Sequence, residues 1–181
     1  MHNCANSLAN RKKAMKPNSE TMRIAIAVTE LSPVQQLWRA ALRHLSDSQA
    51  ELMALFVTDD RWHRAASLPF TCEISRVGGA IADFTTQRAE QVSSEAATRA
   101  QRRMEDLASE AGLALGFKVL SESDQDRISE LVDRTPNILI APSFITSRPI
   151  FAQFRKLDCR IVLIEATEEA VEADELCNGT Q

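Results

Sequence analysis

Polar side chains follow two short apolar runs in this sequence. Thr29 comes directly after the run 22–28, and hydroxyl groups with one arginine follow the run 138–141. Because the carboxyl ends of parallel strands meet at one edge of a sheet, we expect these groups to converge there. Hydroxyls beside an arginine suit an anion. A pocket for an anion or a nucleotide would be lined by Thr29, Val57, Ser143, Thr146, Ser147 and Arg148.

The loop that contains Ser147 and Arg148 also has a purely structural interpretation. Ser147 fits the N-cap position of a helix that begins with Arg148 and Pro149, since serine caps helices well and proline suits the first turn. In that case the hydroxyl satisfies a backbone N–H group and the loop binds no ligand. We favour this structural interpretation and keep the anion pocket as the alternative.

Motifs for nucleotide binding and nucleophilic catalysis are absent. The chain has no G-x-x-x-x-G-K-[ST], no G-x-G-x-x-G after the first run and no G-x-S-x-G. Its three histidines do not follow the predicted strands. We therefore predict no catalytic residues and a protein that is not an enzyme. A hydrolase with Asp59 or Glu30 as general base is a weaker alternative, because no second positioned group is evident.

No metal site is predicted either. Asp59, Asp60 and His63 are crowded and lack a fourth ligand, so a surface turn is the better interpretation. The four cysteines form no C-x-x-C pair. No secretory or membrane-spanning run is visible, which favours a cytoplasmic protein with no membrane partner.

The net charge of -4 argues against a general electrostatic grip on nucleic acid. A basic cluster lies in residues 1–21, but this segment lacks apolar periodicity and reads as a disordered leader. Residues 167–181 are acidic and weakly apolar, and we expect a tail. One domain is expected between them, over residues 22–166.

Five short apolar runs alternate with helical patterns, and this alternation predicts an α/β fold with a doubly wound, five-stranded parallel sheet. Apart from the run 113–120, which alternates in part, these runs lack polar alternation, as expected for strands covered on both faces. The predicted strands are 22–28, 51–57, 113–120, 138–141 and 161–164.

The predicted helices occupy the connections. The first is expected to start at Pro33 after an N-cap at Ser32. Residues 61–79 read as an irregular stretch, and a long helix is predicted from about Ile81 to Glu110, ended by Gly112. A short helix is expected over 128–134, and Phe151, Phe154 and Leu157 form the apolar face of the last helix.

This order of elements resembles the universal stress protein family over Met22 to about Ala166. The resemblance rests on the long second helix, the step Ala111-Gly112-Leu113 into the third strand and the strand Ile138–Ala141. It implies a three-layer sandwich of the adenine-nucleotide α-hydrolase-like type. It also implies a non-catalytic role in stress response or regulation, exerted through protein contacts.

The ATP-binding members of that family carry an aspartate after the first strand and glycines after the fourth. Here Thr29 replaces the aspartate, while Pro142 and Ile145 replace the glycines of G-x-x-G. Proline offers no N–H group, and a branched side chain at position 145 is expected to block the approach of phosphate. We therefore predict no cofactor, with ATP or AMP in a modified pocket as the alternative.

The resemblance also implies a homodimer. In the family the last strand pairs across the dimer axis, and residues 160–165 offer an apolar edge here that would otherwise invite aggregation. A further protein partner is expected, and the sequence does not identify it.

Overall fold

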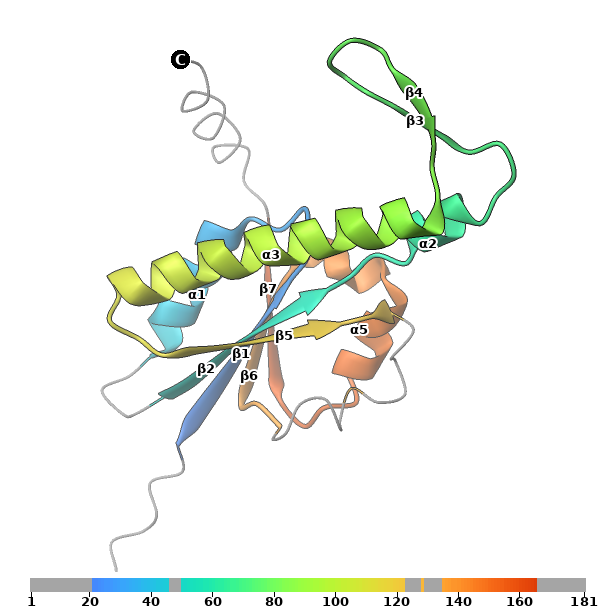
Figure 1. Cartoon of the computed structure of the whole chain (residues 1–181). Helices are drawn as coiled ribbons and strands as arrows, with labels where there is room; N and C mark the ends of the chain where they lie inside the picture. Colours follow the sequence, from blue (N-terminus) through green and yellow to red (C-terminus); the bar gives the residue numbers. More distant parts are fainter. Residues whose placement is uncertain (1–20, 46–49, 123–127, 129–134, 166–181) are drawn as a thin grey trace, which may run out of the picture.

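A computed structural model describes residues 21–45, 50–122, 128 and 135–165. Its centre is a five-stranded sheet in the order β5-β2-β1-β6-β7, and every neighbouring pair is parallel (Figure 1). The predicted doubly wound sheet is therefore confirmed, with each strand within two residues of its predicted bounds. The strands are β1 (Met22–Val28), β2 (Ala50–Val57), β5 (Leu115–Leu120), β6 (Ile138–Pro142) and β7 (Arg160–Ile164).

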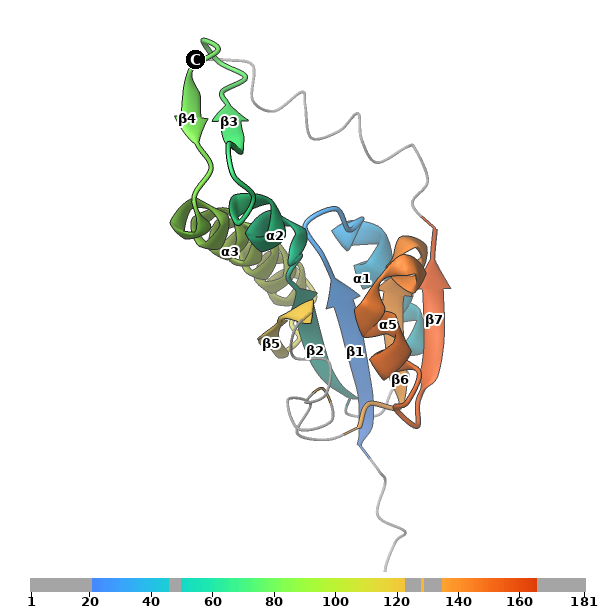
Figure 2. The ribbon, with the colours of Figure 1, turned by 90° about the vertical axis from the view of Figure 1, so that its right-hand side faces the viewer.

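Helices cover both faces of the sheet (Figure 2). On one face α1 (Val34–His44) and α3 (Thr86–Glu110) pack on the strands through Leu37, Trp38 and Met104. On the other face lie the 3₁₀ helix η2 (Ser143–Ser147) and α5 (Pro149–Phe154). The result is the predicted three-layer arrangement.

The strands are buried on both faces because their side chains alternate between two apolar layers. In β1, Ile24 and Ile26 join the layer under α1 and α3, whereas Ala25 and Ala27 join the layer under α5. All four are at most 1% exposed. This central strand therefore carries no polar side chain in its buried part, and chemistry is confined to the ends of the strands.

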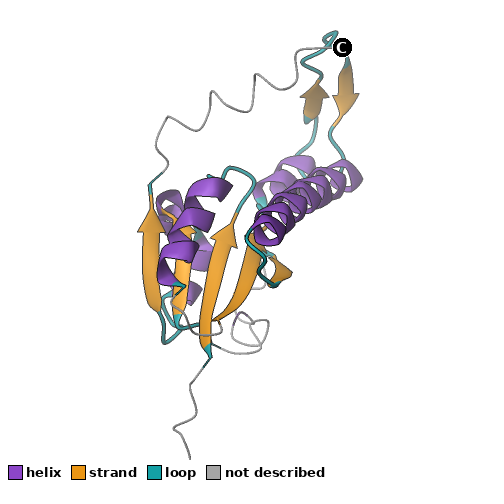
Figure 3. Cartoon of the chain, turned by 90° about the vertical axis from the view of Figure 1, so that its left-hand side faces the viewer, coloured by secondary structure: helices purple, strands orange, loops and turns teal. Residues whose placement is uncertain are grey.

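The connection between β2 and α3 differs from the prediction. Residues 61–79 are not irregular: α2 (Arg61–Ala66) is followed by β3 (Cys72–Ile74), which pairs antiparallel with β4 (Ile81–Asp83). Gly78 and Gly79 adopt positive φ angles in the turn between these strands. This hairpin projects beyond the sheet at its carboxyl edge (Figure 3).

The long helix α3 begins at Thr86 rather than near Ile81 because Thr85 is its N-cap and accepts a hydrogen bond from the Arg88 N–H group at 3.2 Å. Its end agrees with the prediction, since Gly112 adopts φ +66° just after it.

Two predicted caps are wrong. Pro33, not Ser32, precedes α1, and no side chain caps that helix. Arg148, not Ser147, precedes α5. The third predicted strand starts two residues later, at Leu115. The leader up to residue 20, the tail from residue 166 and most of the helix predicted over 128–134 lie outside the described residues.

Candidate functional site

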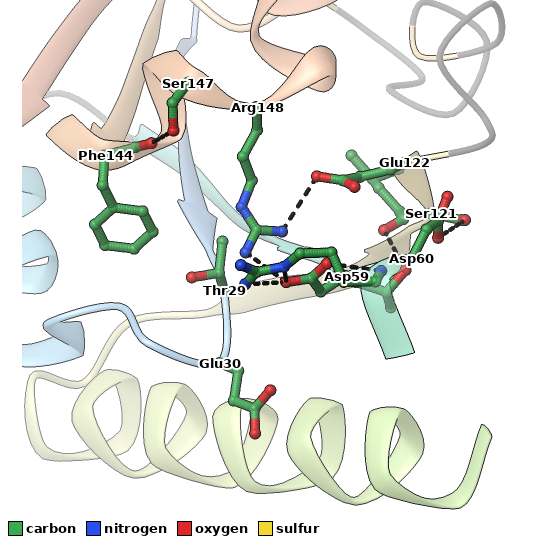
Figure 4. A network of polar contacts seen from close by, with 12 residues as sticks. Thr29, Glu30, Asp59, Asp60, Ser121, Glu122, Phe144, Ser147 and Arg148 are labelled. Atoms are coloured by element: carbon green, nitrogen blue, oxygen red, sulfur yellow. Dashed lines mark hydrogen bonds and ion pairs between the residues drawn. The ribbon is translucent and has the colours of Figure 1, made fainter. Parts of the chain in front are cut away.

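A largely buried arginine joins the start of α5 to the ends of two strands at the carboxyl edge of the sheet (Figure 4). Arg148 precedes α5, and its guanidinium donates to Asp59 Oδ2 at 2.9 Å and to Glu122 Oε1 at 3.1 Å. Asp59 follows β2 and Glu122 follows β5. The three side chains are 12%, 9% and 6% exposed, so water screens these ion pairs little.

A second arginine completes the cluster. Arg61 donates from Nε to Asp59 Oδ2 at 2.6 Å and from its backbone N–H to Oδ1 at 2.9 Å. Burial alone would raise the pKa of Asp59, but the hydrogen bonds from Arg61 and the charges of Arg148 and Arg61 outweigh it and lower that pKa. An aspartate held so firmly as a carboxylate is a weak general base.

Thr29 and Val57, two of the residues proposed for the anion pocket, lie beside this cluster. Together with Arg148 they line a cavity of about 110 Å³. The polar atoms of Thr29 are already engaged: its N–H donates to Ser32 Oγ at 2.7 Å, and the two hydroxyls are 3.1 Å apart. The remaining lining residues are Glu30, Leu31, Phe56, Thr58, Asp59, Arg61, Trp62, Ser93 and Ala96.

The other three predicted pocket residues do not line this cavity. Ser143, Thr146 and Ser147 form η2, a tight turn in which side-chain hydroxyls reach back to the helix backbone. Thr146 donates to the Ser143 carbonyl and Ser147 to the Phe144 carbonyl, both at 2.8 Å. This back-bonding is the physical reason why Ser147 does not cap α5 and why neither donor is available to an anion there.

The two residues that replace the family's glycines lie at the end of β6 and in η2. Ile145 is fully buried in the apolar layer with Ile150 and Phe154, so its side chain anchors η2 in the core and does not line this cavity. Pro142 is the last residue of β6, paired with Ile164.

Ligands of doubly wound sheets bind where the chain leaves neighbouring strands in opposite directions. Here that crevice lies between the ends of β1 and β6, because β1 continues into α1 on one face and β6 leads to α5 on the other. The Arg148 side chain crosses it, from the start of α5 to the ends of β2 and β5.

Glu30 points away from Arg148 towards α3 (Figure 4), and its carboxylate accepts a hydrogen bond from Trp62 Nε1 at 3.4 Å. Asp60 accepts one from the Ser121 hydroxyl at 3.1 Å. Among the described residues, no group of three or more histidine, cysteine, aspartate or glutamate side chains is placed to hold a metal ion.

Sequence analysis missed the pairing of Arg148 with Asp59 and the role of Glu122. Asp59 and Arg148 are 89 residues apart, and each alone looks like a surface residue. The sequence offered one indication of this pairing, because Asp59, Glu122 and Arg148 each follow an expected strand.

No protein-family model matches the chain, and no curated protein matches it. Solved structures match its backbone. A protein from the universal stress protein family from Burkholderia pseudomallei is 16% identical, with a TM-score of 0.46 over 83% of this chain and all of the other. Hypothetical protein PH0823 is 13% identical, with a TM-score of 0.51 over 82% and 98%. Hypothetical protein MJ0577 is 12% identical, with a TM-score of 0.49 over the same shares.

Of these three matches, the one to hypothetical protein PH0823 has a TM-score above 0.5, and it shows a shared fold. No helix in the described part of the chain is long and apolar enough to cross a membrane.

Replacing the central arginine tests the buried cluster. In Arg148→Met the aliphatic stem remains, but Glu122 loses its cation and Asp59 keeps only Arg61. We expect a loss of about 3 kcal/mol in the free energy of unfolding, measured with urea, because an unpaired buried charge is costly. The control Arg23→Met removes an exposed pair with Glu51 and should cost under about 1 kcal/mol. Equal losses in the two variants would contradict the cluster's burial.

The pKa of Asp59 predicts a pH dependence. Because folding lowers this pKa, the stabilisation from the carboxylate is complete above the unfolded value of about 3.9 and is lost as the pH falls through the folded value. The difference in unfolding free energy between the wild type and Asp59→Asn should be constant from about pH 5 to 7 and should shrink below about pH 4. Asp106→Asn, at an exposed site on α3, is the control and should show no such trend.

Proposed function

We propose that this is a non-catalytic, universal-stress-like protein of the cytoplasm, with a role in stress response or regulation exerted through dimerisation and protein contacts. One observation carries the proposal. The crevice in which this fold class binds its ligands is crossed by Arg148, which is held there by Asp59 and Glu122.

The electrostatics of the crevice disfavour a triphosphate. The two arginines, Arg61 and Arg148, are balanced by Asp59 and Glu122. Glu30 also lines the cavity and makes the local balance negative. A volume of about 110 Å³ is well below the 300–1,000 Å³ of typical ligand pockets. Binding ATP would require both arginines to leave their carboxylates.

The edge strand β7 supports dimerisation. Among the described strands it pairs with β6 alone. Its Leu163 is 42% exposed, and Ile161, Val162 and Ile164 are half-buried. An unpaired apolar edge is a site for pairing with another chain, and two-fold pairing with a second copy would cover it.

The alternative is a sensor for an anion or a nucleotide such as AMP or ATP. Arg148 and Arg61 both line the cavity, and a phosphate could replace the carboxylates as their partner. This alternative differs from the main proposal in requiring a ligand that competes with Asp59 and Glu122.

Thermal melting with millimolar ATP and Mg²⁺ separates the two. Our proposal predicts no shift in the melting temperature and no nucleotide absorbance in the purified protein. A ligand at a hundred times its Kd would stabilise the fold by about 2.7 kcal/mol, which is readily measured. A clear upward shift that adenosine does not reproduce, and that is lost in Arg148→Met, would support the sensor instead.

Light scattering on a sizing column tests the dimer. The wild type should elute at twice its chain mass of 20.1 kDa. Leu163→Lys, which places a charge on the proposed two-fold edge, should elute at the single-chain mass. The matched control is Val119→Lys on β5, the opposite edge of the sheet, where Val119 is 51% exposed. A monomeric wild type, or dissociation by both variants alike, would overturn the β7 interface.

A further inference from the structure

Four of the five most exposed large apolar side chains among the described residues lie on the hairpin. We call residues 70–83 the hairpin arm. Phe70 is 99% exposed, Val77 90%, Ile81 70% and Ile74 68%. A two-stranded hairpin is marginally stable in water by itself, and exposed apolar groups that cluster mark an interaction surface. The arm projects from α2 and α3 with no described residue over its tip (Figures 1 and 3).

The two faces of the arm differ. Glu73 accepts hydrogen bonds from Arg88 Nε and Nη2 at 2.8 and 2.9 Å, and this pair ties one face to the first turn of α3. Because side chains alternate along a strand, Cys72 and Ile74 lie on the opposite face. Ile81 is directly across from Ile74. We call this opposite face, formed by Cys72, Ile74, Ile81 and Asp83, the outer face.

Basic groups flank the arm. Arg64 on α2 and Arg76 in the hairpin turn are exposed and make no ion pair among the described residues, while Arg88 balances Glu73. Asp83, across from Cys72, is the one acidic group of the arm without such a partner among the described residues. The surroundings of the outer face therefore suit an apolar ligand that also carries negative charge.

The chain itself contains a segment of this chemistry outside the described residues. Residues 166–181 include Val171, Leu176 and Cys177, and their charged residues are all acidic. The acidic residues are Glu168, Glu169, Glu172, Asp174 and Glu175.

This segment begins close enough to reach the arm. It follows β7, which is parallel to β2, so both strands end at the same edge of the sheet (Figure 2). Two strands separate them, which places their ends about 14 Å apart at the usual strand spacing. The arm continues from β2 through the short helix α2. An extended chain from Ile164 to Cys177 spans about 40 Å.

We propose that the C-terminal segment 166–181 docks on the outer face of the hairpin arm of the same chain. Val171 and Leu176 cover Ile74 and Ile81, the acidic residues lie near Arg64 and Arg76, and Cys177 comes close to Cys72. This inference is independent of nucleotide binding and of the β7 dimer.

The two cysteines report on the docking without any added label. The reduced full-length protein is treated with diamide, which accepts the two hydrogen atoms of a thiol pair as the disulfide forms, and the links are mapped by mass spectrometry. A disulfide requires Cα atoms within about 7 Å. We expect an intramolecular Cys72–Cys177 link whose rate does not depend on protein concentration.

A matched variant distinguishes docking from random collisions of the segment. In Cys72→Ser combined with Ser94→Cys, the new thiol lies at an exposed site on α3, outside the arm. Its link to Cys177 should form at least ten times more slowly. Equal rates would overturn the proposal, as would an intermolecular Cys72–Cys72 link, which would make a second copy the occupant of the outer face.

Substitutions on the arm test the chemistry of the contact. Ile74→Ser with Ile81→Ser should slow the Cys72–Cys177 link several-fold while the melting temperature stays the same, since both side chains are exposed. Arg64→Gln with Arg76→Gln should slow it about two-fold at low salt. The control pair Arg102→Gln and Arg103→Gln, exposed on α3, should leave the rate unchanged. Rates that no arm variant alters would refute docking on this face.

Discussion

A charge buried beside a sheet must have a partner, and this requirement shapes the carboxyl edge of the protein. Arg148 can be buried because Asp59 and Glu122 accept its hydrogen bonds. The two carboxylates follow the ends of β2 and β5, and the arginine precedes α5. The pairing therefore fixes the start of α5 relative to the ends of β2 and β5. The same side chains also occupy the crevice in which doubly wound sheets bind their ligands.

The sheet could be predicted from the sequence because the pattern that indicates each strand lies within a few consecutive residues. β1 and β6 are continuous apolar runs, and a run without polar alternation indicates a strand covered on both sides. Gly112 likewise marked the end of α3 through its own backbone preference. The hairpin arm was missed because β3 and β4 have three residues each, too few for a period to emerge, and because Ile81 and Phe84 extend the helical spacing of α3 towards its N-terminus.

The site was harder to predict from the sequence because its residues interact across long distances in the chain. Thr29, Val57 and Arg148 were chosen as candidates from their positions at or after the ends of strands, and all three line one cavity. What the arginine binds depends on the three-dimensional arrangement of β2, β5 and β6, which no spacing in the sequence encodes. The hydroxyls of Thr146 and Ser147 bond within their own 3₁₀ turn instead, because the nearest acceptors are backbone carbonyl groups of that turn.

The position of β1 in the sheet has a consequence for synthesis on the ribosome. One edge of β1 pairs with β2, which follows soon after it in the chain. The other edge pairs with β6, which is synthesised much later. The contact that closes this side joins Arg23 to Asn137, 114 residues later. Until that residue emerges, the nascent chain carries the open edge of its central strand. An open edge can pair with other chains, so the half-built sheet is most prone to aggregation in that interval.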